Sequence, residues 1–391
     1  MAGGYILFPV PLIFGLLAKL MHSKLWFGDY QAIACAGQKV LQNAPIYSLG
    51  LKCDGMHASS YVYIPIVAQA AGFVEGLVTE RGFFWLYLIA FLASLAILIW
   101  FSFFSNKAPG HWRDRLPFMV FLSGSAFMWG NVAVILHGAI LASVLLLETM
   151  PVLFITCVAI SAWVKPVFLT YLIVILLADR PIQQRLGLAA TGLIAGLFPT
   201  LIFACFGGTE AQNWFHLLSH FVYEETPGYG FFGWLALAGI KSNSLLVQLA
   251  YLVFAALIGL SGLSLSEGLR LTQKDRLWLA LSLAALLIPR IMSQDVFLLA
   301  PGMIVVAQKS AQLLTRQAFQ RGQMIVLCLC SLALLGGLTN LANVLTPLSL
   351  LGLCVYILYM GQSVFKERRR RILARMISRL RTVIPKSRSV L

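Results

Sequence analysis

Charged residues are scarce in this sequence. Only 11% of its 391 residues are Asp, Glu, Lys or Arg, whereas 60% are hydrophobic. Soluble domains carry roughly 25% charged residues. No polar stretch of domain length interrupts the apolar runs between Tyr5 and Met360. The composition therefore excludes a soluble protein and predicts an all-α polytopic membrane protein.

Acidic residues are the scarcer charge, with 14 Asp and Glu against 29 Lys and Arg and a net charge of +15. Such a balance suggests nucleic acid as a partner, but the basic residues lie in short loops between apolar runs and in a C-terminal cluster. This is the positive-inside pattern of membrane proteins. The C-terminal segment, residues 362–391, has apolar residues at helical spacing among its Arg residues. We expect this basic amphipathic tail to bind anionic lipids of the cytoplasmic leaflet and no nucleic acid.

The seven cysteines show no metal-ligand spacing, and no phosphate-binding glycine loop is present. We therefore expect no metal site and no cofactor. Most of the cysteines lie in apolar runs, where Cys behaves as a small hydrophobic residue. Cys35 and Cys53 lie in a polar stretch, and the sequence leaves open whether they pair. The first apolar run lacks a basic leader, and no cleavable signal peptide is evident.

The apolar runs predict about 12 membrane crossings, because roughly 20 apolar residues span a bilayer. Three of the runs (116–147, 151–178 and 277–307) have polar residues or proline at their midpoints, which indicates helical hairpins that turn at the outer surface. Of the 29 basic residues, 21 then lie on the inner side, and only five lie in the outer loops 23–82 and 207–243. This asymmetry places both termini in the cytoplasm. We expect one membrane domain, residues 1–361, followed by the tail.

Asp29 is the first candidate functional residue. It lies just after the first apolar run, in the stretch Trp26–Tyr30. A carboxylate at the membrane face is costly unless it is used. The competing interpretation is that Asp29 caps the helix predicted to begin at Tyr30, which is a common role for Asp.

The predicted topology brings further polar features to the same face as Asp29. They come from separate segments: Asn131, Lys165, the pair Asn243-Ser244, and the turn Pro289–Asp295 with Arg290, Ser293, Gln294 and Asp295. Two cations near an outward cavity favour a phosphate or pyrophosphate ligand. The alternative is an ion pair, such as Arg290 with Asp295, that only fixes helix packing.

At these positions the chain resembles the family 87 glycosyltransferases, which belong to the GT-C superfamily and use polyprenol-phosphate-mannose. Gly28-Asp29-Tyr30 through Pro45-Ile46-Tyr47 is similar to the signature around the family's aspartate. Gly130-Asn131, Lys165-Pro166, Asn243-Ser244-Leu245 and Pro289–Asp295 resemble its later motifs, in the same order over residues 25–305. The chain departs from the pattern after Asp295, where Val296 follows and no His is present.

The resemblance implies a GT-C-type bundle with an active site that faces the periplasm of the bacterial inner membrane. It implies transfer of a mannose-like hexose or pentose from a polyprenyl-phosphate donor to a lipid or glycan acceptor. Asp29 is then the general base. The other motif residues, including Tyr30 and Tyr47, then contact substrates, and Lys165 and Arg290 hold the phosphate. Two alternatives stay open: a flippase or transporter of lipid-linked sugars without chemistry, and an O-antigen-type polymerase or ligase. The sequence does not decide whether His216 and His220 take part.

Overall fold

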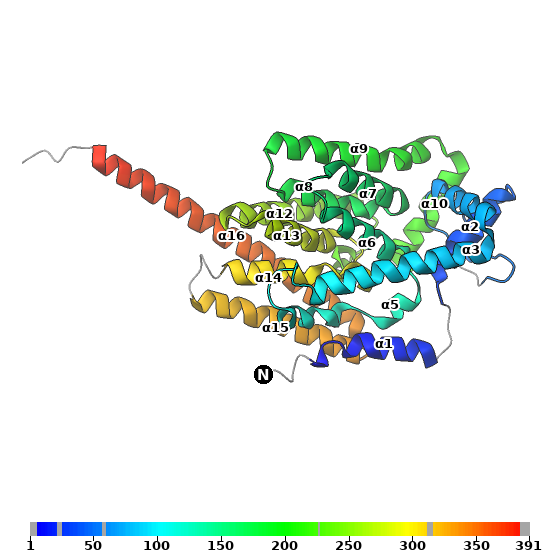
Figure 1. The fold of residues 1–391 in the computed structure, drawn as a ribbon, viewed down its shortest axis with the longest axis horizontal. Helices are drawn as coiled ribbons and strands as arrows, with labels where there is room; N and C mark the ends of the chain where they lie inside the picture. The colour runs from blue at the N-terminus through cyan, green and yellow to red at the C-terminus, as the bar shows by residue number, and fades with distance from the viewer. Residues whose placement is uncertain (1–5, 22–25, 57–59, 226, 311–315, 384–391) are drawn as a thin grey trace, which may run out of the picture.

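Every regular element of the described chain is a helix (Figure 1). The computed structural model describes residues 6–21, 26–56, 60–225, 227–310 and 316–383. The first half contains α1 (Val10–Met21), α2 (Gly28–Leu41), α3 (Pro65–Ile99), α4 (Trp112–Arg115), α5 (Gly124–Met128), α6 (Val132–Val144), α7 (Pro151–Val164) and α8 (Ile173–Leu177). The second half contains α9 (Ile182–Phe206), α10 (Gly208–Ser219), α11 (Phe231–Leu237), α12 (Leu245–Gly268), α13 (Gln273–Leu287), α14 (Leu299–Ser310), α15 (Arg316–Leu338) and α16 (Ala342–Val383).

Five helical stretches are long and apolar enough to cross a membrane: Pro65–Phe104, Ile182–Phe206, Leu245–Gly268, Gln320–Leu338 and Ala342–Arg369. Four shorter apolar stretches accompany them: Val10–Met21, Val132–Val144, Pro151–Val164 and Pro166–Leu177. The prediction of a helical membrane protein is thus confirmed. The predicted number of about 12 crossings is not confirmed, because several apolar runs form helices too short to span a bilayer.

The short helices α6, α7 and α8 lie inside the bundle, with the longer helices α9 above and α15 below them (Figure 1). Nearly every residue of α13 and α14 is buried, and these two helices pack against each other. By contrast, α9 and α12 expose large apolar side chains such as Phe198 and Leu252. A helix that turns apolar residues outward requires apolar surroundings. The outer faces of α9 and α12 therefore suit lipid.

The three midpoints that interrupt the apolar runs are breaks between helices, as the sequence predicts. Asn131 directly precedes α6, and Lys165 directly follows α7. The turn 289–295 separates α13 from α14 and contains the short 3₁₀ helix Ser293–Asp295. Each break leaves backbone groups at a helix end that need partners, and the polar side chains at these points supply several of them.

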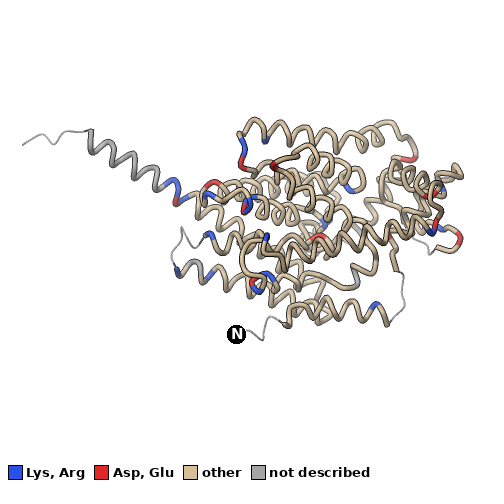
Figure 2. The backbone as a smooth tube through the Cα atoms, viewed as in Figure 1, with Lys and Arg blue, Asp and Glu red and all other residues tan. Residues whose placement is uncertain are grey.

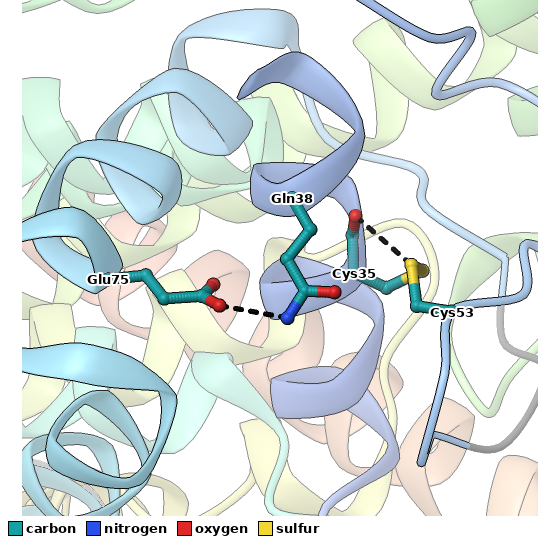
Figure 3. Close-up of a disulfide and its surroundings, with 4 residues drawn as sticks. All are labelled: Cys35, Gln38, Cys53 and Glu75. Atoms are coloured by element: carbon teal, nitrogen blue, oxygen red, sulfur yellow. Dashed lines mark hydrogen bonds between the residues drawn. A yellow bond between two sulfur atoms is a disulfide. The ribbon is translucent and has the colours of Figure 1, made fainter. Parts of the chain in front are cut away.

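The predicted outer loop 23–82 is largely structured. It contains α2 and the first half of α3, and Thr79 interrupts α3 with a positive φ of 66°. Cys35 and Cys53 form a disulfide, which answers the question that the sequence leaves open (Figure 3). On the opposite side of α2, Gln38 donates a 2.8 Å hydrogen bond to Glu75 of α3. These links fix α2 against its neighbours.

Lys and Arg are concentrated at the end of the bundle from which α16 leaves (Figure 2). At this basic end Glu267 accepts hydrogen bonds from Arg276 at 2.6 Å and from Arg185 at 3.4 Å. Arg115 is fully buried and donates to four backbone carbonyls, those of residues 103, 105, 109 and 110. The predicted tail is a continuation of α16 rather than a separate helix.

Candidate functional site

Two chain segments pack closely to hold Asp29. Phe27 N–H donates to the Met128 carbonyl at 3.0 Å, and Asp29 N–H donates to the Trp129 carbonyl at 3.4 Å. Gly130 has a φ of +56°, and a Cβ there would lie 2.2 Å from the Phe27 ring. Glycine is therefore required at position 130 for the segment 27–29 to lie against 128–132.

The Asp29 carboxylate binds the N-terminus of α6 rather than that of its own helix. Its Oδ2 accepts a hydrogen bond from the Tyr63 hydroxyl at 2.7 Å and another from the Val132 N–H at 3.2 Å. The residue preceding α2 is Phe27, and no side chain caps that end. The positive end of the α6 dipole favours a carboxylate at this point. The capping interpretation is thus replaced by a contact between residues 103 positions apart.

One oxygen of this carboxylate is left without a partner. Oδ1 of Asp29 makes no hydrogen bond with any residue that the structure describes, and the side chain is 22% exposed. Burial, together with the charge of Asp29, raises the pKa of the Tyr63 hydroxyl well above its ordinary value of 10. Tyr63 therefore keeps its proton and stays a donor to Oδ2. The carboxylate is fixed through one oxygen, and the other oxygen is available.

Lys165 lies beside Asp29 without forming a tight ion pair. Its Nζ donates to Asn131 Oδ1 at 2.7 Å and lies 3.9 Å from Asp29 Oδ2. Asn131 Oδ1 also accepts from Ala133 N–H, so Asn131 is the N-cap of α6. The Lys165 side chain is 23% exposed. An ammonium group has three donors, and Asn131 takes one of them. Asp29, Asn131 and Lys165, which the sequence places on one face, are thus in direct contact.

A second polar group lies behind this contact. Asp295 Oδ1 is 3.0 Å from His137 Nε2, and His137 Nδ1 is 2.7 Å from the Tyr171 hydroxyl. Asp295 Oδ2 accepts from the Met292 N–H at 2.8 Å. A carboxylate oxygen can only accept a hydrogen bond, so the ring nitrogen Nε2 of His137 is the donor to Asp295. All three side chains are buried. This group, Asp295–His137–Tyr171, fixes the turn 289–295.

The contact between Asp29, Asn131 and Lys165 and the group Asp295–His137–Tyr171 are held by the same helices. Asn131 is the N-cap of α6 and His137 lies near the middle of that helix. Lys165 precedes the 3₁₀ helix Pro166–Leu172, and Tyr171 lies within it. Asp29, Asp295 and Arg290 all act electrostatically on the Lys165 ammonium. The predicted cation pair Lys165 and Arg290 is therefore close enough for each charge to influence the other.

The second outer loop packs on the turn that carries Arg290. Tyr229 N–H donates to the Ile291 carbonyl at 2.7 Å, and Phe232 N–H donates to the Pro289 carbonyl at 3.0 Å. A Cβ on Gly228 would lie 2.7 Å from the Ile291 carbonyl oxygen, and the φ of Gly228 is +74°. Glycine at position 228 thus permits the close approach of the two segments. Ser293 and Gln294 are buried within the turn.

Four of the predicted site residues lie outside this contact network. The Tyr30 hydroxyl donates to the Glu80 carbonyl, and the Tyr47 hydroxyl donates to the Tyr63 carbonyl. Both tyrosines are buried and support the site from behind. Asn243 and Ser244 are exposed, and Ser244 is the N-cap of α12, where it accepts from the Val247 N–H at 3.4 Å. The geometry thus gives Ser244 a local structural role.

Four residues of the site were not predicted from the sequence. Tyr63 bonds the Asp29 carboxylate and His137 bonds the Asp295 carboxylate, whereas Tyr171 bonds the His137 ring. Lys19 of α1 lies 4.5 Å above the Trp129 ring at the edge of the site. An ionisable side chain within an apolar run is a recognised sign of function, and His137 carries that sign. Lys19, an ionisable residue of the apolar helix α1, carries that sign as well, whereas Tyr63 and Tyr171 carry no local signal.

Comparisons with known proteins identify no relative. No protein-family model matches the chain, and neither a curated protein nor a solved structure matches it.

Proposed function

We propose that the protein is a membrane glycosyltransferase that uses a polyprenyl-phosphate-linked sugar as its donor. The observation that carries this proposal is the geometry of Asp29. One oxygen of the carboxylate is fixed by Tyr63 and Val132, while Oδ1 makes no hydrogen bond with a described residue. The side chain is 22% exposed and lies beside the Lys165 ammonium. A general base requires a positioned carboxylate with an oxygen accessible to the acceptor hydroxyl. The reaction class, transfer of a sugar from a polyprenyl phosphate, is inferred from the sequence resemblance.

In the proposed reaction, the acceptor hydroxyl oxygen attacks the anomeric carbon of the donor sugar. Its proton passes to Oδ1 of Asp29 as the new C–O bond forms. The bond between the anomeric carbon and the phosphate oxygen breaks, and polyprenyl phosphate leaves with the electron pair. Lys165 and Arg290 stabilise the charge that develops on this phosphate. Direct attack from the face opposite the leaving group inverts the configuration of the sugar carbon.

A crevice beside the site suits the lipid part of the donor. It has a volume of about 250 Å³ and is lined mainly by α1 and by the segment 120–123, with Gly337 of α15 and Ala342 of α16. The polar side chains of Tyr229, Ser293 and Thr346 also line it. Tyr229 and Ser293 belong to the two segments that meet at the Arg290 turn. A prenyl chain in this crevice would place its phosphate near Arg290. Catalytic and lipid-binding surfaces would then be adjacent.

The disulfide supports an outward orientation of the site. Disulfides persist in oxidising compartments, and Cys35 lies on the same helix as Asp29. The basic end is at the opposite end of the bundle, as expected for a cytoplasmic side. Membrane-impermeant thiol reagents should therefore label cysteines introduced at residues 48–56 and leave those at 106–115 unlabelled. Labelling of 106–115 from outside would overturn the orientation.

The direct test of the proposal is transfer by the purified full-length protein. The protein in lipid nanodiscs is incubated with a panel of radiolabelled polyprenyl-phosphate sugars and a membrane lipid extract as acceptor source. We expect a labelled product with one donor in the panel, and its loss in Asp29→Asn. A flippase would instead move the donor across vesicles and form no new glycosidic bond. Transport without product, or failure to bind any polyprenyl phosphate, would overturn the proposal.

A further inference from the structure

A crevice lies between α6 and α13, far from Asp29. Its walls are Leu141, Val144 and Leu145 from the end of α6, and Leu277, Trp278 and Leu281 from the beginning of α13. Asp29 contacts the opposite end of α6, at Val132. The helix has 13 residues, and at 1.5 Å per residue it separates the two sites by about 20 Å. The crevice is therefore independent of the proposed active site.

The wall of this crevice is apolar, and three charged side chains line it as well. Leu141, Val144, Trp278 and Leu281 are buried, so they form a fixed surface. Lys107, Lys274 and Glu148 are exposed and complete the lining. The volume is about 290 Å³. That space suits a head group with the first carbons of its chains, and the rest of a lipid would continue along the apolar surface of the bundle.

The two lysines of the crevice are not held in ion pairs by the part of the chain that the structure describes. Neither Lys107 nor Lys274 forms an ion pair with a carboxylate of the described chain, whereas nearby Lys309 pairs with Asp275 at 3.6 Å and Arg276 pairs with Glu267. With Glu148, the crevice has a net charge of +1. Basic pockets between helices at the cytoplasmic side are suited to anionic head groups. Two ammonium groups fit a phosphodiester, and a carboxylate fits a hydroxyl donor on the same head group.

We propose that this crevice binds an anionic phospholipid whose head group combines a phosphodiester with hydroxyl groups, as in phosphatidylglycerol. The phosphate lies between Lys107 and Lys274, and Glu148 accepts a hydrogen bond from a glycerol hydroxyl. The first methylenes of the acyl chains contact Trp278 and the leucines.

Native mass spectrometry of the full-length protein tests the proposal, because it counts retained lipids. Protein in detergent is titrated with phosphatidylglycerol, phosphatidylethanolamine or phosphatidylcholine. Lys107→Gln combined with Lys274→Gln removes the two charges without disturbing the buried wall. The matched control is Lys39→Gln with Lys52→Gln, two lysines that line a hollow of about 520 Å³ beside the disulfide at the other end of the molecule. All variants keep the basic tail, so any lipid that the tail binds contributes equally to each measurement.

We expect the wild type and the control to retain one phosphatidylglycerol more tightly than phosphatidylcholine. The Lys107/Lys274 variant should bind that lipid about 30-fold more weakly, which corresponds to about 1 kcal/mol for each lysine near the membrane surface. An equal loss in the control, or no loss in the variant, would overturn the proposal. Retention of phosphatidylethanolamine as tight as that of phosphatidylglycerol would also overturn it, because the ethanolamine ammonium would then pair with Glu148.

Discussion

Replacement of Asp29 by Asn separates chemistry from structure at the proposed site. The side chain keeps its size, and its carbonyl oxygen can accept the hydrogen bonds that Tyr63 and Val132 now donate to Oδ2. The amide group then occupies the position of Oδ1, where no described residue is bonded. Only the 3.9 Å contact with Lys165 is lost. A partly exposed pair at that distance contributes up to about 1 kcal/mol, so the folded state should persist.

The chemical step should respond far more strongly. An amide cannot take the acceptor proton, and loss of a general base typically lowers a rate by about 10²-fold to 10⁴-fold. The smaller value corresponds to about 2.7 kcal/mol in the activation free energy. Asp29→Ala is the structural comparison. It leaves the buried Tyr63 hydroxyl and the Val132 N–H without partners, at a cost of about 1–3 kcal/mol for each group, so it should also lower the melting temperature.

The assay combines turnover of a radiolabelled polyprenyl-phosphate sugar with the melting temperature of each variant in nanodiscs. The expected pattern for Asp29→Asn is lost turnover, a melting temperature close to wild type, and intact donor binding. Near-normal turnover would refute the role of Asp29 as the base. Asp295 would be a poor alternative candidate for the base, because both of its carboxylate oxygens are hydrogen-bonded and its side chain is buried.

Five further variants test other parts of the site and the fold. Lys165→Ala and Arg290→Ala should each weaken binding of decaprenyl phosphate by about tenfold to 150-fold, since a hydrogen bond to a charged group contributes about 1.5–3 kcal/mol. Calorimetry measures this, and unchanged affinity with a lower melting temperature would make the cations structural. His137→Gln keeps a donor for Asp295 and should keep decaprenyl phosphate binding, whereas His137→Leu should weaken it. Equal affinities of the two variants would contradict a positioning role for the histidine. Cys53→Ser opens a loop of about 18 residues, so the free energy of unfolding should fall by about 3 kcal/mol. An unchanged denaturation midpoint would show that the disulfide contributes no stability.

The positions of the helix breaks could be predicted from the sequence, but the number of crossings could not. Asn131 and Lys165 stand out because polar residues interrupt apolar runs at those points. An apolar run indicates that its residues are removed from water. It does not show whether lipid or protein surrounds the helix. In the structure α13 and α14 are surrounded by other helices, and α6 has only 13 residues. The structure thus has five helical stretches long and apolar enough to cross a membrane, and it does not confirm the predicted number of about 12 crossings.

The direct contacts of the site were harder to predict than its location. Tyr63 and Tyr171 are aromatic residues among many, and nothing in the local sequence distinguishes them. His137 and Asp295 are 158 positions apart, so only the folded chain joins them. At Ser244 the motif predicts a ligand contact, and the structure adds a second role, because the side chain caps the helix that follows. A short polar motif at the start of a helix fits the pattern of an N-cap as well as the pattern of a ligand contact.

The geometry of Asp29 and Lys165 argues against a purely structural ion pair. A pair that stabilises a fold should be close and hydrogen-bonded, because only then does attraction offset the loss of hydration. Here the charged atoms are 3.9 Å apart, and each side chain is about a fifth exposed. Their short hydrogen bonds go instead to the neutral partners Tyr63 and Asn131. The protein thus holds each charge in place without neutralising it, and leaves one carboxylate oxygen and two ammonium donors for a ligand.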